Sequence, residues 1–197
     1  MARNPELTRQ LIVDKALTIF NTKGYNAASL SDITSISGMT KGAIYGNFKN
    51  KDELATAAFE HGVEMVKCEI AKRVRAEATA PDKLRAIVRF YEEYIEKPPI
   101  IGGCPIFNSS IEADDSLPFL RSRVIRSIAL LKDSLTKIVN RGIVEGQIKK
   151  GVDAEEFANF FYSIITGATS LSRIEGDSRS YKFVKKFVER QVEEISA

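Results

Sequence analysis

The sequence predicts an all-α protein of about nine helices. Apolar residues recur at the three- and four-residue spacing of helices along most of the 197 residues. No segment shows the alternating pattern with hairpin turn residues that is typical of β-strands. The composition, 44% hydrophobic and 28% charged, is ordinary for a globular protein with a sizeable core. We therefore expect a three-helix N-terminal head followed by a larger helical domain.

The first two helices have clear start and stop signals. Residues 5–22 form the first, on an apolar face made by Ile12, Ala16, Ile19 and Phe20. Gly24 then provides a left-handed stop. Ser29 and Asp32 have the spacing of a capping box, which predicts the start of a second helix that ends at Gly38. Its inward-facing residues are expected to be Leu30, Ile33 and Ile36.

A third helix is expected to begin after Thr40, held to the core by Ile44 and Phe48, which are four residues apart. Asn50 followed by Glu53 is typical of another helix start and predicts a long fourth helix to about Arg75.

The remaining helices are predicted mainly from their apolar stripes. Pro81 suits the first turn of a fifth helix, which Pro98-Pro99 ends. The segment 100–115 is ambiguous, and a short helix ending near Glu112 is one interpretation. Three more helices are expected over residues 118–142, 154–173 and 180–195.

Charge separates the head from the rest of the chain. Residues 1–51 contain seven Lys or Arg and three Asp or Glu, a net charge of +4. The other 146 residues contain 22 basic and 23 acidic residues, a net charge of −1. A basic module joined to a nearly neutral one favours a DNA-binding head on a larger body.

Several other classes of protein are disfavoured. His61 is the only histidine, so the chain has no histidine-based triad or multi-histidine metal site, and we expect neither a metal nor a cofactor. Gly102-Gly103 lacks the Lys-Ser/Thr that follows a phosphate-binding loop. The chain has no apolar run of about 18 residues and no apolar signal core at its N-terminus. We expect a cytoplasmic protein that is neither an enzyme nor a membrane protein.

A set of spaced residues covers about 47 positions of the head: Thr8-Arg9 through Phe20, Gly24-Tyr25, Ser29 to Ile33, Gly38, Lys41-Gly42-Ala43-Ile44-Tyr45 and Phe48-Lys49-Asn50-Lys51-Asp52-Glu53-Leu54. In these residues the head resembles that of the TetR family of bacterial transcriptional regulators. The resemblance implies a homodimer whose heads, residues 1–51, bind a palindromic double-stranded DNA operator. Residues 52–197 would form the ligand-binding and dimerisation domain, with the helix of about residues 51–75 as the connection. In the family an effector, here an unknown small molecule, typically changes the separation of the heads and releases DNA.

The resemblance also assigns roles in the head. A recognition helix places its N-terminal residues against base edges in the major groove. Lys41 can donate to guanine and the Ala43 methyl can meet a thymine methyl. The base-reading positions are Thr40, Lys41, Gly42 and Ala43, and the phosphate donors are Ser29, Tyr45, Asn47 and Lys51. The chain departs from the family at Asn47, often His, and at Ser31, where some relatives carry a base-reading Arg.

Pocket and interface residues are predicted from apolar surface in the body. A mostly apolar pocket with a few polar groups suits Tyr91, Tyr94, Cys104, Phe107, Ile111, Phe161 and Tyr162, although each also fits core packing. The helix of residues 154–173 is apolar nearly all round, which predicts burial on two sides. A second copy is expected to cover Phe160, Ile164, Gly167 and Ala168, with Tyr181, Val184, Phe187 and Val188 of the last helix.

Two alternatives remain open at the sequence level. The segment 103–108, with Glu112, resembles one in a subset of TetR-like regulators, some of which sense electrophiles or oxidants through a cysteine, here Cys104. A small buried thiol is the alternative interpretation of that residue. The chain can also be a constitutive DNA-binding protein or a partner-binding adaptor without a small ligand.

Overall fold

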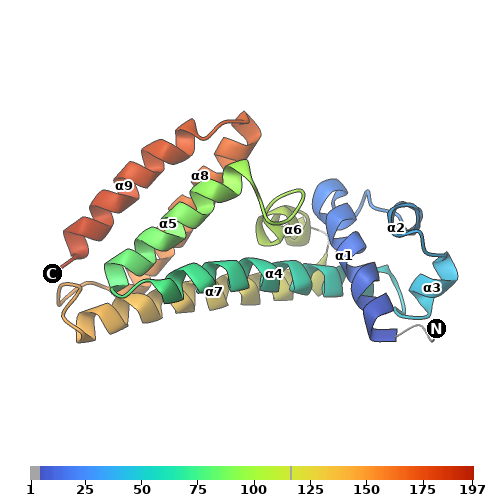
Figure 1. The fold of residues 1–197 in the computed structure, drawn as a ribbon, viewed down its shortest axis with the longest axis horizontal. Helices are drawn as coiled ribbons and strands as arrows, with labels where there is room; N and C mark the ends of the chain where they lie inside the picture. Colours follow the sequence, from blue (N-terminus) through green and yellow to red (C-terminus); the bar gives the residue numbers. More distant parts are fainter. Residues whose placement is uncertain (1–4, 116) are drawn as a thin grey trace. The chain divides into compact units, whose positions relative to one another are not determined.

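The computed structural model describes residues 5–115 and 117–197, and within them it confirms the all-α prediction. The only strand-like feature in these residues is an isolated bridge between Ile148 and Ser196. The helices, drawn in Figure 1, are α1 (Pro5–Lys23), α2 (Leu30–Ser37), α3 (Lys41–Tyr45), α4 (Lys51–Ala76), α5 (Ala80–Glu96), α6 (Pro105–Asp115), α7 (Pro118–Val144), α8 (Ala154–Glu175) and α9 (Arg179–Ile195). Among the described residues no helix combines the length and hydropathy needed to cross a membrane.

The chain divides into two compact units. The first unit comprises the residues up to Val66 together with Pro99–Ile125, and the second comprises Lys67–Pro98 and Arg126–Ala197. The first therefore contains α1, α2, α3 and α6, and the second contains α5, α8 and α9. Helices α4 and α7 each contribute to both. The sequence-based boundary between residues 51 and 52 stays a prediction.

Local capping explains where the helices of the first unit begin and end. The Ser29 hydroxyl accepts a hydrogen bond from the Asp32 backbone N–H at 3.1 Å, and the Asp32 carboxylate accepts the Ser29 backbone N–H at 2.9 Å. Gly38 ends α2 with φ of +65°. The Asn50 side chain accepts the Glu53 backbone N–H at 2.9 Å at the start of α4. The same residues predict these helix ends from the sequence alone.

Helices α2 and α3 each contribute one buried residue to the core of the first unit. Ile33 and Ile44 are fully buried, which attaches α2 and α3 to the rest of the unit, and Phe48 is buried beyond them. Ile36 was expected to face inward, but 46% of it is exposed. A helix as short as α2 has room for few buried positions, and Ile33 occupies the central one.

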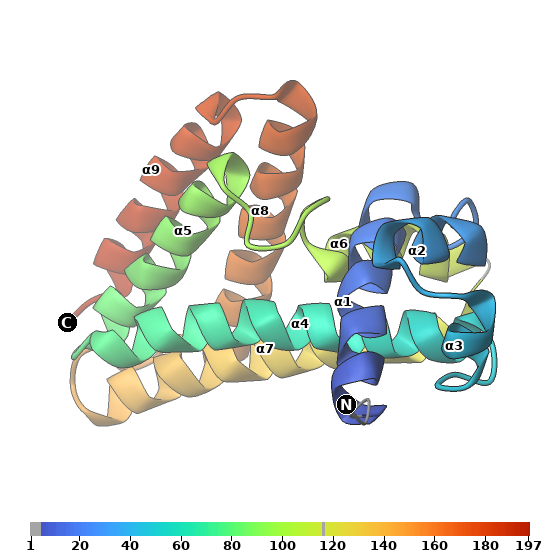
Figure 2. The ribbon, with the colours of Figure 1, turned by 45° about the vertical axis from the view of Figure 1, so that its right-hand side comes forward.

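In the second unit α5, α8 and α9 run side by side in both ribbon views (Figures 1 and 2). Their contacts are mainly apolar, and Tyr181 adds buried hydrogen bonds to them: its hydroxyl, on α9, donates to the Val88 carbonyl of α5 at 2.7 Å. Burial is the main reason that the pKa of Tyr181 is raised above its usual range. The Tyr181 backbone N–H in turn donates to the Ser172 hydroxyl of α8 at 2.9 Å.

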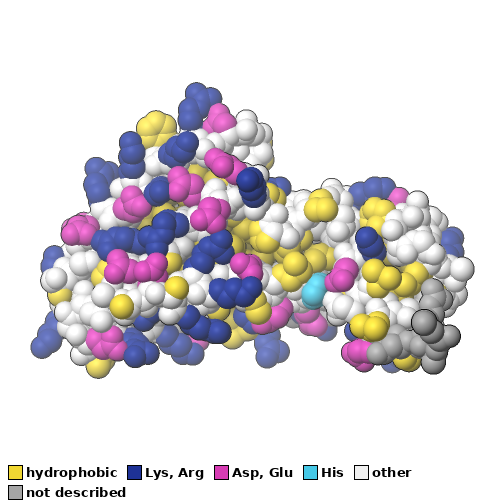
Figure 3. Space-filling view, in the orientation of Figure 1, with side chains coloured by type: hydrophobic (Ala, Val, Ile, Leu, Met, Phe, Trp, Pro, Cys, Tyr) yellow, Lys and Arg dark blue, Asp and Glu magenta, His cyan; other side chains and the backbone are white. Residues whose placement is uncertain are grey.

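Ion pairs cover the outer side of α5 and α9. Arg85 of α5 lies 2.6 Å from Glu193 of α9, and Lys185 of α9 lies 2.7 Å from Glu92 of α5. Figure 3 shows this region as a mixture of basic and acidic side chains. Surface pairs of this kind contribute little each, about 0–1 kcal/mol, so the apolar contacts hold these helices together.

The ambiguous segment 100–115 becomes a glycine turn followed by a helix. Gly102 and Gly103 have φ of +89° and +98°, and α6 then runs from Pro105 to Asp115. A β-carbon on Gly102 would lie 2.5 Å from the Asn21 carbonyl oxygen, so the turn depends on the absence of a side chain there. The segment therefore packs tightly against the end of α1.

Candidate DNA-binding surface and ligand cavity

Helix α3 has one buried anchor and an exposed opposite side. The Thr40 hydroxyl caps it by accepting the Ala43 backbone N–H at 3.2 Å, and Ile44 is 1% exposed. Lys41, Gly42 and Tyr45 are exposed, whereas Ala43 is partly buried. The residues predicted to read bases and the predicted phosphate donor Tyr45 thus lie together on one short helix, and the buried Ile44 fixes which side faces out.

The start of α2 is an ordered cluster of polar groups. The Ser29 hydroxyl donates to the Asp32 carboxylate at 2.8 Å, and the Lys23 ammonium lies 2.6 Å from the same carboxylate. Hydrogen bonds from Lys23 and then from Ser29 lower the pKa of Asp32 to about 2. Because the Ser29 hydroxyl proton already has this acceptor, a phosphate at this helix start would bind backbone N–H groups more readily than the Ser29 side chain.

Two of the predicted phosphate donors make bonds within the head. The Asn47 amide donates to the Ala43 carbonyl at 2.8 Å. The Lys51 ammonium donates to the Tyr25 carbonyl at 2.5 Å and lies 4.2 Å from the centre of the Tyr25 ring. Each group has a further proton to offer, but Lys51 also stabilises the turn between α1 and α2. The exposed Lys49 was not assigned a role from the sequence.

Tyr25 links this turn to α4. Its hydroxyl donates to the Asp52 carboxylate, and its ring meets Phe119 edge-on at 5.2 Å between ring centres. Burial, followed by the hydrogen bond and the negative charge of Asp52, raises the pKa of Tyr25 to about 12. The phenol is therefore neutral at physiological pH and holds the α1–α2 turn to the start of α4.

A second polar cluster joins the end of α1 to the glycine turn and α6. The Asn21 amide donates to the Ile101 and Gly103 carbonyls at 2.8 and 2.7 Å. The Asn108 amide donates to the Asn21 side-chain oxygen and to the Gly102 carbonyl, both at 2.9 Å. Asn21 is buried, so these bonds satisfy polar groups that water does not reach.

Glu112 of α6 binds the turn after α1 directly. Its carboxylate accepts the backbone N–H groups of Tyr25 and Asn26 at 2.6 and 3.2 Å. Gly24, with φ of +79°, allows this approach, because a β-carbon there would lie 2.8 Å from the carboxylate. Cys104 precedes α6 and is partly buried, and its carbonyl accepts the Asn108 backbone N–H at 3.0 Å. A sensing role for its thiol stays a prediction.

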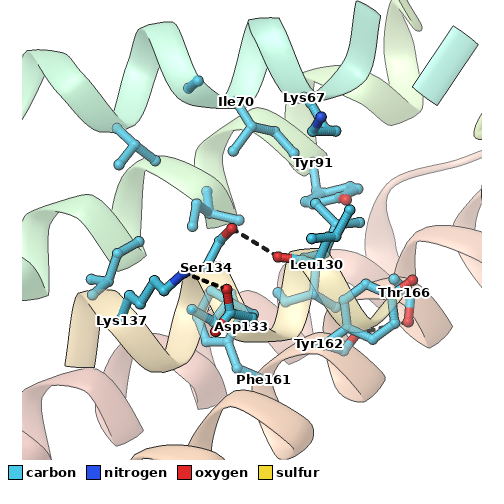
Figure 4. Close-up of a pocket in the computed structure, with 17 residues that line it drawn as sticks. Lys67, Ile70, Tyr91, Leu130, Asp133, Ser134, Lys137, Phe161, Tyr162 and Thr166 are labelled. Carbon is cyan, nitrogen blue, oxygen red and sulfur yellow. Dashed lines mark hydrogen bonds and ion pairs between the residues drawn. The ribbon is translucent and has the colours of Figure 1, made fainter. Parts of the chain in front are cut away.

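A cavity of about 490 Å³ lies within the second unit (Figure 4). This volume is typical of small-molecule sites, which span roughly 300–1,000 Å³. Its walls come from four helices: Lys67, Ile70, Ala71 and Val74 of α4; Ile87 and Tyr91 of α5; Leu130, Leu131, Asp133, Ser134, Leu135, Lys137 and Ile138 of α7; and Phe161, Tyr162, Ile165 and Thr166 of α8.

Some of the predicted pocket residues line this cavity and others lie elsewhere. Tyr91, Phe161 and Tyr162 are in its walls. Tyr94 does not line it, because it points into the core and packs on Phe90 with ring centres 5.5 Å apart. Cys104, Phe107 and Ile111 belong to the first unit and are not in its walls. The α4 and α7 wall was missed, although the apolar spacing of Ile70 and Val74 was a usable signal.

The predicted interface residues fall into two groups. Ala168, Tyr181 and Val188 are buried in the chain's own core, so they have no surface to offer a second copy, which corrects the sequence-based expectation. Phe160, Ile164 and Val184 are partly buried, and Gly167 and Phe187 are exposed. Leu171 and Ile174 of α8, which are 56% and 81% exposed, are not among the residues predicted for the interface.

A capped helix-turn-helix in a basic head, followed by a helical body with an apolar cavity, defines a DNA-binding regulator. The described residues contain no cluster of metal-binding side chains. Comparison with known families agrees with this class. The model "Tetracyclin repressor-like, C-terminal domain" matches residues 80–188, and "Bacterial regulatory proteins, tetR family" matches residues 12–58.

Individual proteins show the same similarity along nearly the whole chain. A TetR transcriptional regulator from Chloroflexus aurantiacus J-10-FL is 32% identical, with a TM-score of 0.94 and 98% of each chain covered. One from Cytophaga hutchinsonii is 30% identical, with a TM-score of 0.92 and coverage of 98% and 96%. The transcriptional repressor DhaR of Mycobacterium sp. strain GP1 is 24% identical over 176 residues, 89% of this chain and 86% of that protein.

The chain belongs to the TetR family of bacterial transcriptional regulators. Members of this family are DNA-binding transcription factors and not enzymes. Both expectations from the sequence, the family and the absence of an enzymatic role, are confirmed.

Proposed function

We propose that this protein is a ligand-responsive repressor that binds a palindromic operator as a homodimer and is released by a small molecule. The observation that carries the proposal is the pairing, in one chain, of an exposed recognition helix α3 with an apolar cavity of about 490 Å³. A constitutive DNA-binding protein has no need of such a cavity. The repressor output is supported by the relative DhaR, whose name describes a repressor.

Recognition of DNA rests on the head. Lys41, at the first position of α3, is exposed and can donate to guanine O6 or N7, while Gly42 allows the backbone close to the groove. Tyr45 and Asn47 lie near the end of the same helix and supply phosphate donors. Thr40 and Ala43 complete the base-reading group, with Ser29 and Lys51 at the edges of the contact. Two such heads would sit about 34–36 Å apart, one turn of DNA.

Dimerisation is supported by an apolar stripe on α8. Phe160, Ile164, Gly167, Leu171 and Ile174 follow one another at spacings of four, three, four and three residues, which puts them on one face of the helix. A β-carbon on Gly167 would meet nothing within 4 Å, so another backbone can approach closely there. Because helices of a bundle need an apolar partner for such a stripe, a second copy of α8 is the partner we propose.

Phe187 extends the stripe from α9, with its ring 6.0 Å from that of Phe160. Val184 lies one turn earlier on the same helix and is partly buried. Two helices from each copy would then form a four-helix contact, an isologous arrangement typical of two-fold symmetric dimers.

A DNA-binding titration tests the proposal. DNA fragments selected by the protein from a random pool should share a palindrome, and a labelled fragment should shift as a complex with two copies. Adding small molecules one class at a time should release the fragment for at least one class. A protein that selects no common sequence, or that binds it as a monomer, contradicts the proposal. A complex that no ligand of the cavity dissociates identifies a constitutive binder instead.

A further inference from the structure

The peptide unit between Tyr25 and Asn26, in the turn after α1, is held from both of its sides. Its N–H group, on Asn26, donates to the Glu112 carboxylate of α6 at 3.2 Å. Its carbonyl, on Tyr25, accepts the Lys51 ammonium of α4 at 2.5 Å. The N–H and C=O groups of a trans peptide point in opposite directions. A chain of hydrogen bonds therefore crosses the turn from the Glu112 carboxylate to the Lys51 ammonium.

The charges at the two ends strengthen this chain. Charge-assisted hydrogen bonds are roughly twice as strong as neutral ones. An anion beside the N–H group and a cation beside the carbonyl both match the dipole of the peptide, and hydrogen bonds in a chain polarise one another. The Glu112 carboxylate also accepts the Tyr25 backbone N–H at 2.6 Å. The negative charge of Glu112 thus stabilises the bond that the Lys51 ammonium makes.

The position of Glu112 is set by other contacts of α6. This helix lies beside α1 in both ribbon views (Figures 1 and 2). One turn before Glu112, the Asn108 amide donates to the Asn21 side-chain oxygen at 2.9 Å. A β-carbon on Gly24 would lie 2.8 Å from the carboxylate, so glycine leaves the room that the side chain occupies. Glu112 therefore reaches the turn from a helix that is bonded to the end of α1.

Lys51 keeps N–H donors for a further partner. An ammonium has three of them, and the Tyr25 carbonyl takes one. The side chain is half-buried and lies 4.2 Å from the centre of the Tyr25 ring. Immobilising a free lysine carries one of the larger entropy costs among the side chains. A lysine that is already held loses less freedom on binding a phosphate, which strengthens the contact.

We propose that Glu112 is a positioning residue for DNA binding. Through the peptide between Tyr25 and Asn26, its carboxylate fixes the Lys51 ammonium in the orientation that contacts a phosphate of the DNA backbone. This inference rests on the proposed function, in which Lys51 is a phosphate donor. It adds to that function a residue of α6 that acts through Lys51, so that a negatively charged side chain strengthens the binding of a polyanion.

The sign of the effect separates positioning from simple charge. Removing a carboxylate from a DNA-binding protein should by itself tighten the binding of a polyanion. Glu112→Gln should instead weaken binding, because the glutamine oxygen can accept one of the two N–H groups while its NH₂ presents a donor to the other. Fluorescence anisotropy with a labelled DNA duplex of arbitrary sequence should show a loss of about fivefold, the range of one exposed ion pair. Unchanged or tighter binding overturns the inference.

A double-mutant cycle assigns the effect to Lys51. The salt slope is the change in the logarithm of the association constant with the logarithm of the salt concentration. Lys51→Ala and Glu112→Gln should each reduce it by about one, the value for one phosphate contact. The double variant should bind no more weakly than Lys51→Ala alone, since Glu112 acts through Lys51. Losses of affinity that add in the double variant overturn the inference.

Two controls exclude a general effect of charge or of stability. Glu60→Gln removes another carboxylate of the first unit, which pairs with Arg123 at 3.1 Å on the surface, and it should not weaken DNA binding. Asn108→Ala loosens the contact between α1 and α6 but keeps Glu112, so well below its Tm it should retain the wild-type salt slope. A salt slope reduced by one in either control overturns the inference.

The same measurements distinguish this inference from the proposed function. If Lys51→Ala weakens binding and Glu112→Gln does not, the phosphate contact stands and the role of Glu112 is wrong. If neither change weakens binding, both the inference and the phosphate contact of Lys51 are wrong. If both weaken binding as described but the protein selects no palindrome, the inference stands and the operator of the proposed function is wrong.

Discussion

The side-chain amide of Asn108 donates to the side-chain oxygen of Asn21 at 2.9 Å, across 87 residues of sequence. The Asn21 side-chain amide donates to the carbonyls of Ile101 and Gly103 in the glycine turn. The two asparagine side chains and the glycine turn thus satisfy one another's hydrogen-bonding groups in the interior of the first unit. The end of α1, which leads into the DNA-binding helices, is held to α6 by this cluster.

Removing the Asn108 amide should destabilise the first unit. In Asn108→Ala the Asn21 side-chain oxygen loses its donor while it stays buried, which costs about 1–3 kcal/mol. For a chain of 197 residues each kcal/mol lowers the Tm by about 2–4 °C, so we expect a fall of about 2–12 °C in scanning calorimetry. Asn140→Ala, on an exposed position of α7, is the control and should change Tm little. Equal effects of the two changes would contradict a special role for the cluster.

The close approach of the Asn21 carbonyl to Gly102 leads to a second prediction. Gly102 and Gly146 both have positive φ, +89° and +71°, so alanine is strained at either position by about 1–2 kcal/mol. At Gly102 the new β-carbon would also lie 2.5 Å from the Asn21 carbonyl oxygen, whereas at Gly146 it meets nothing within 4 Å. Gly102→Ala should therefore lower Tm clearly more than Gly146→Ala. If both lower it equally, backbone strain alone explains the effect.

Acid should weaken the start of α2 through Asp32. Its pKa falls from 3.8 to about 2 because Lys23 and then Ser29 donate to the carboxylate. A folded-state pKa below the unfolded value means that this stabilisation is present above about pH 4 and is lost as the pH falls towards 2. Asp32→Asn should lower Tm at pH 7 and have little effect at pH 2.

The control for this prediction is Asp133→Asn, which breaks an exposed ion pair on α7. Its effect on Tm should be small at both pH values, because exposed pairs contribute little. A difference between wild type and Asp32→Asn that is the same at pH 2 and pH 7 would show that the ionised carboxylate is not the stabilising group.

Replacing Lys41 should relax base preference without changing the fold. Lys41 is exposed at the start of α3, and each good contact to a base is worth about 1–3 kcal/mol of discrimination. Competition binding of Lys41→Ala with single-base variants of the selected operator should show a loss of base discrimination at one position per half-site. Lys51→Ala, which removes a proposed phosphate contact, should instead weaken binding to all sequences alike and reduce the salt slope by about one. Uniform weakening by Lys41→Ala would contradict base reading.

Charge on the α8 stripe should prevent dimerisation. Leu171→Glu places a carboxylate in the middle of the proposed interface, where burial without a partner is strongly unfavourable. Sedimentation should then show a monomer with helix content unchanged, and affinity for the palindrome should fall at least about tenfold. Ile111→Glu, at a position 65% exposed in the first unit, should stay dimeric. If the Leu171→Glu protein is still dimeric, α8 is not part of the dimer interface.

The elements of this fold could be predicted from the sequence because their signals are local. The Ser29–Asp32 and Asn50–Glu53 pairs are found where helices α2 and α4 begin, and Gly38 ends α2 in the left-handed conformation expected of it. Capping acts across three or four residues and needs no distant partner. The family resemblance, also carried by a continuous stretch of the head, is confirmed for the same reason.

Which face of each helix is buried depends on the tertiary structure. Periodicity indicates that α8 and α9 are apolar on several sides, but it does not say which side the chain covers itself. Packing against α5 buries Tyr181 and Val188, and it leaves Leu171 and Ile174 outside. Two of the residues predicted for the interface, Tyr181 and Val188, are therefore buried within the chain, and the exposed Leu171 and Ile174 are not among the predicted ones.

The sequence by itself determined the all-α fold, the helix boundaries in the head and the family of this protein. Only the tertiary structure brought Asn21 to Asn108 and assembled a cavity from α4, α5, α7 and α8. The physical reason is range: caps and helical periodicity depend on neighbours along the chain. A cavity or a buried polar cluster depends on which distant side chains packing brings together.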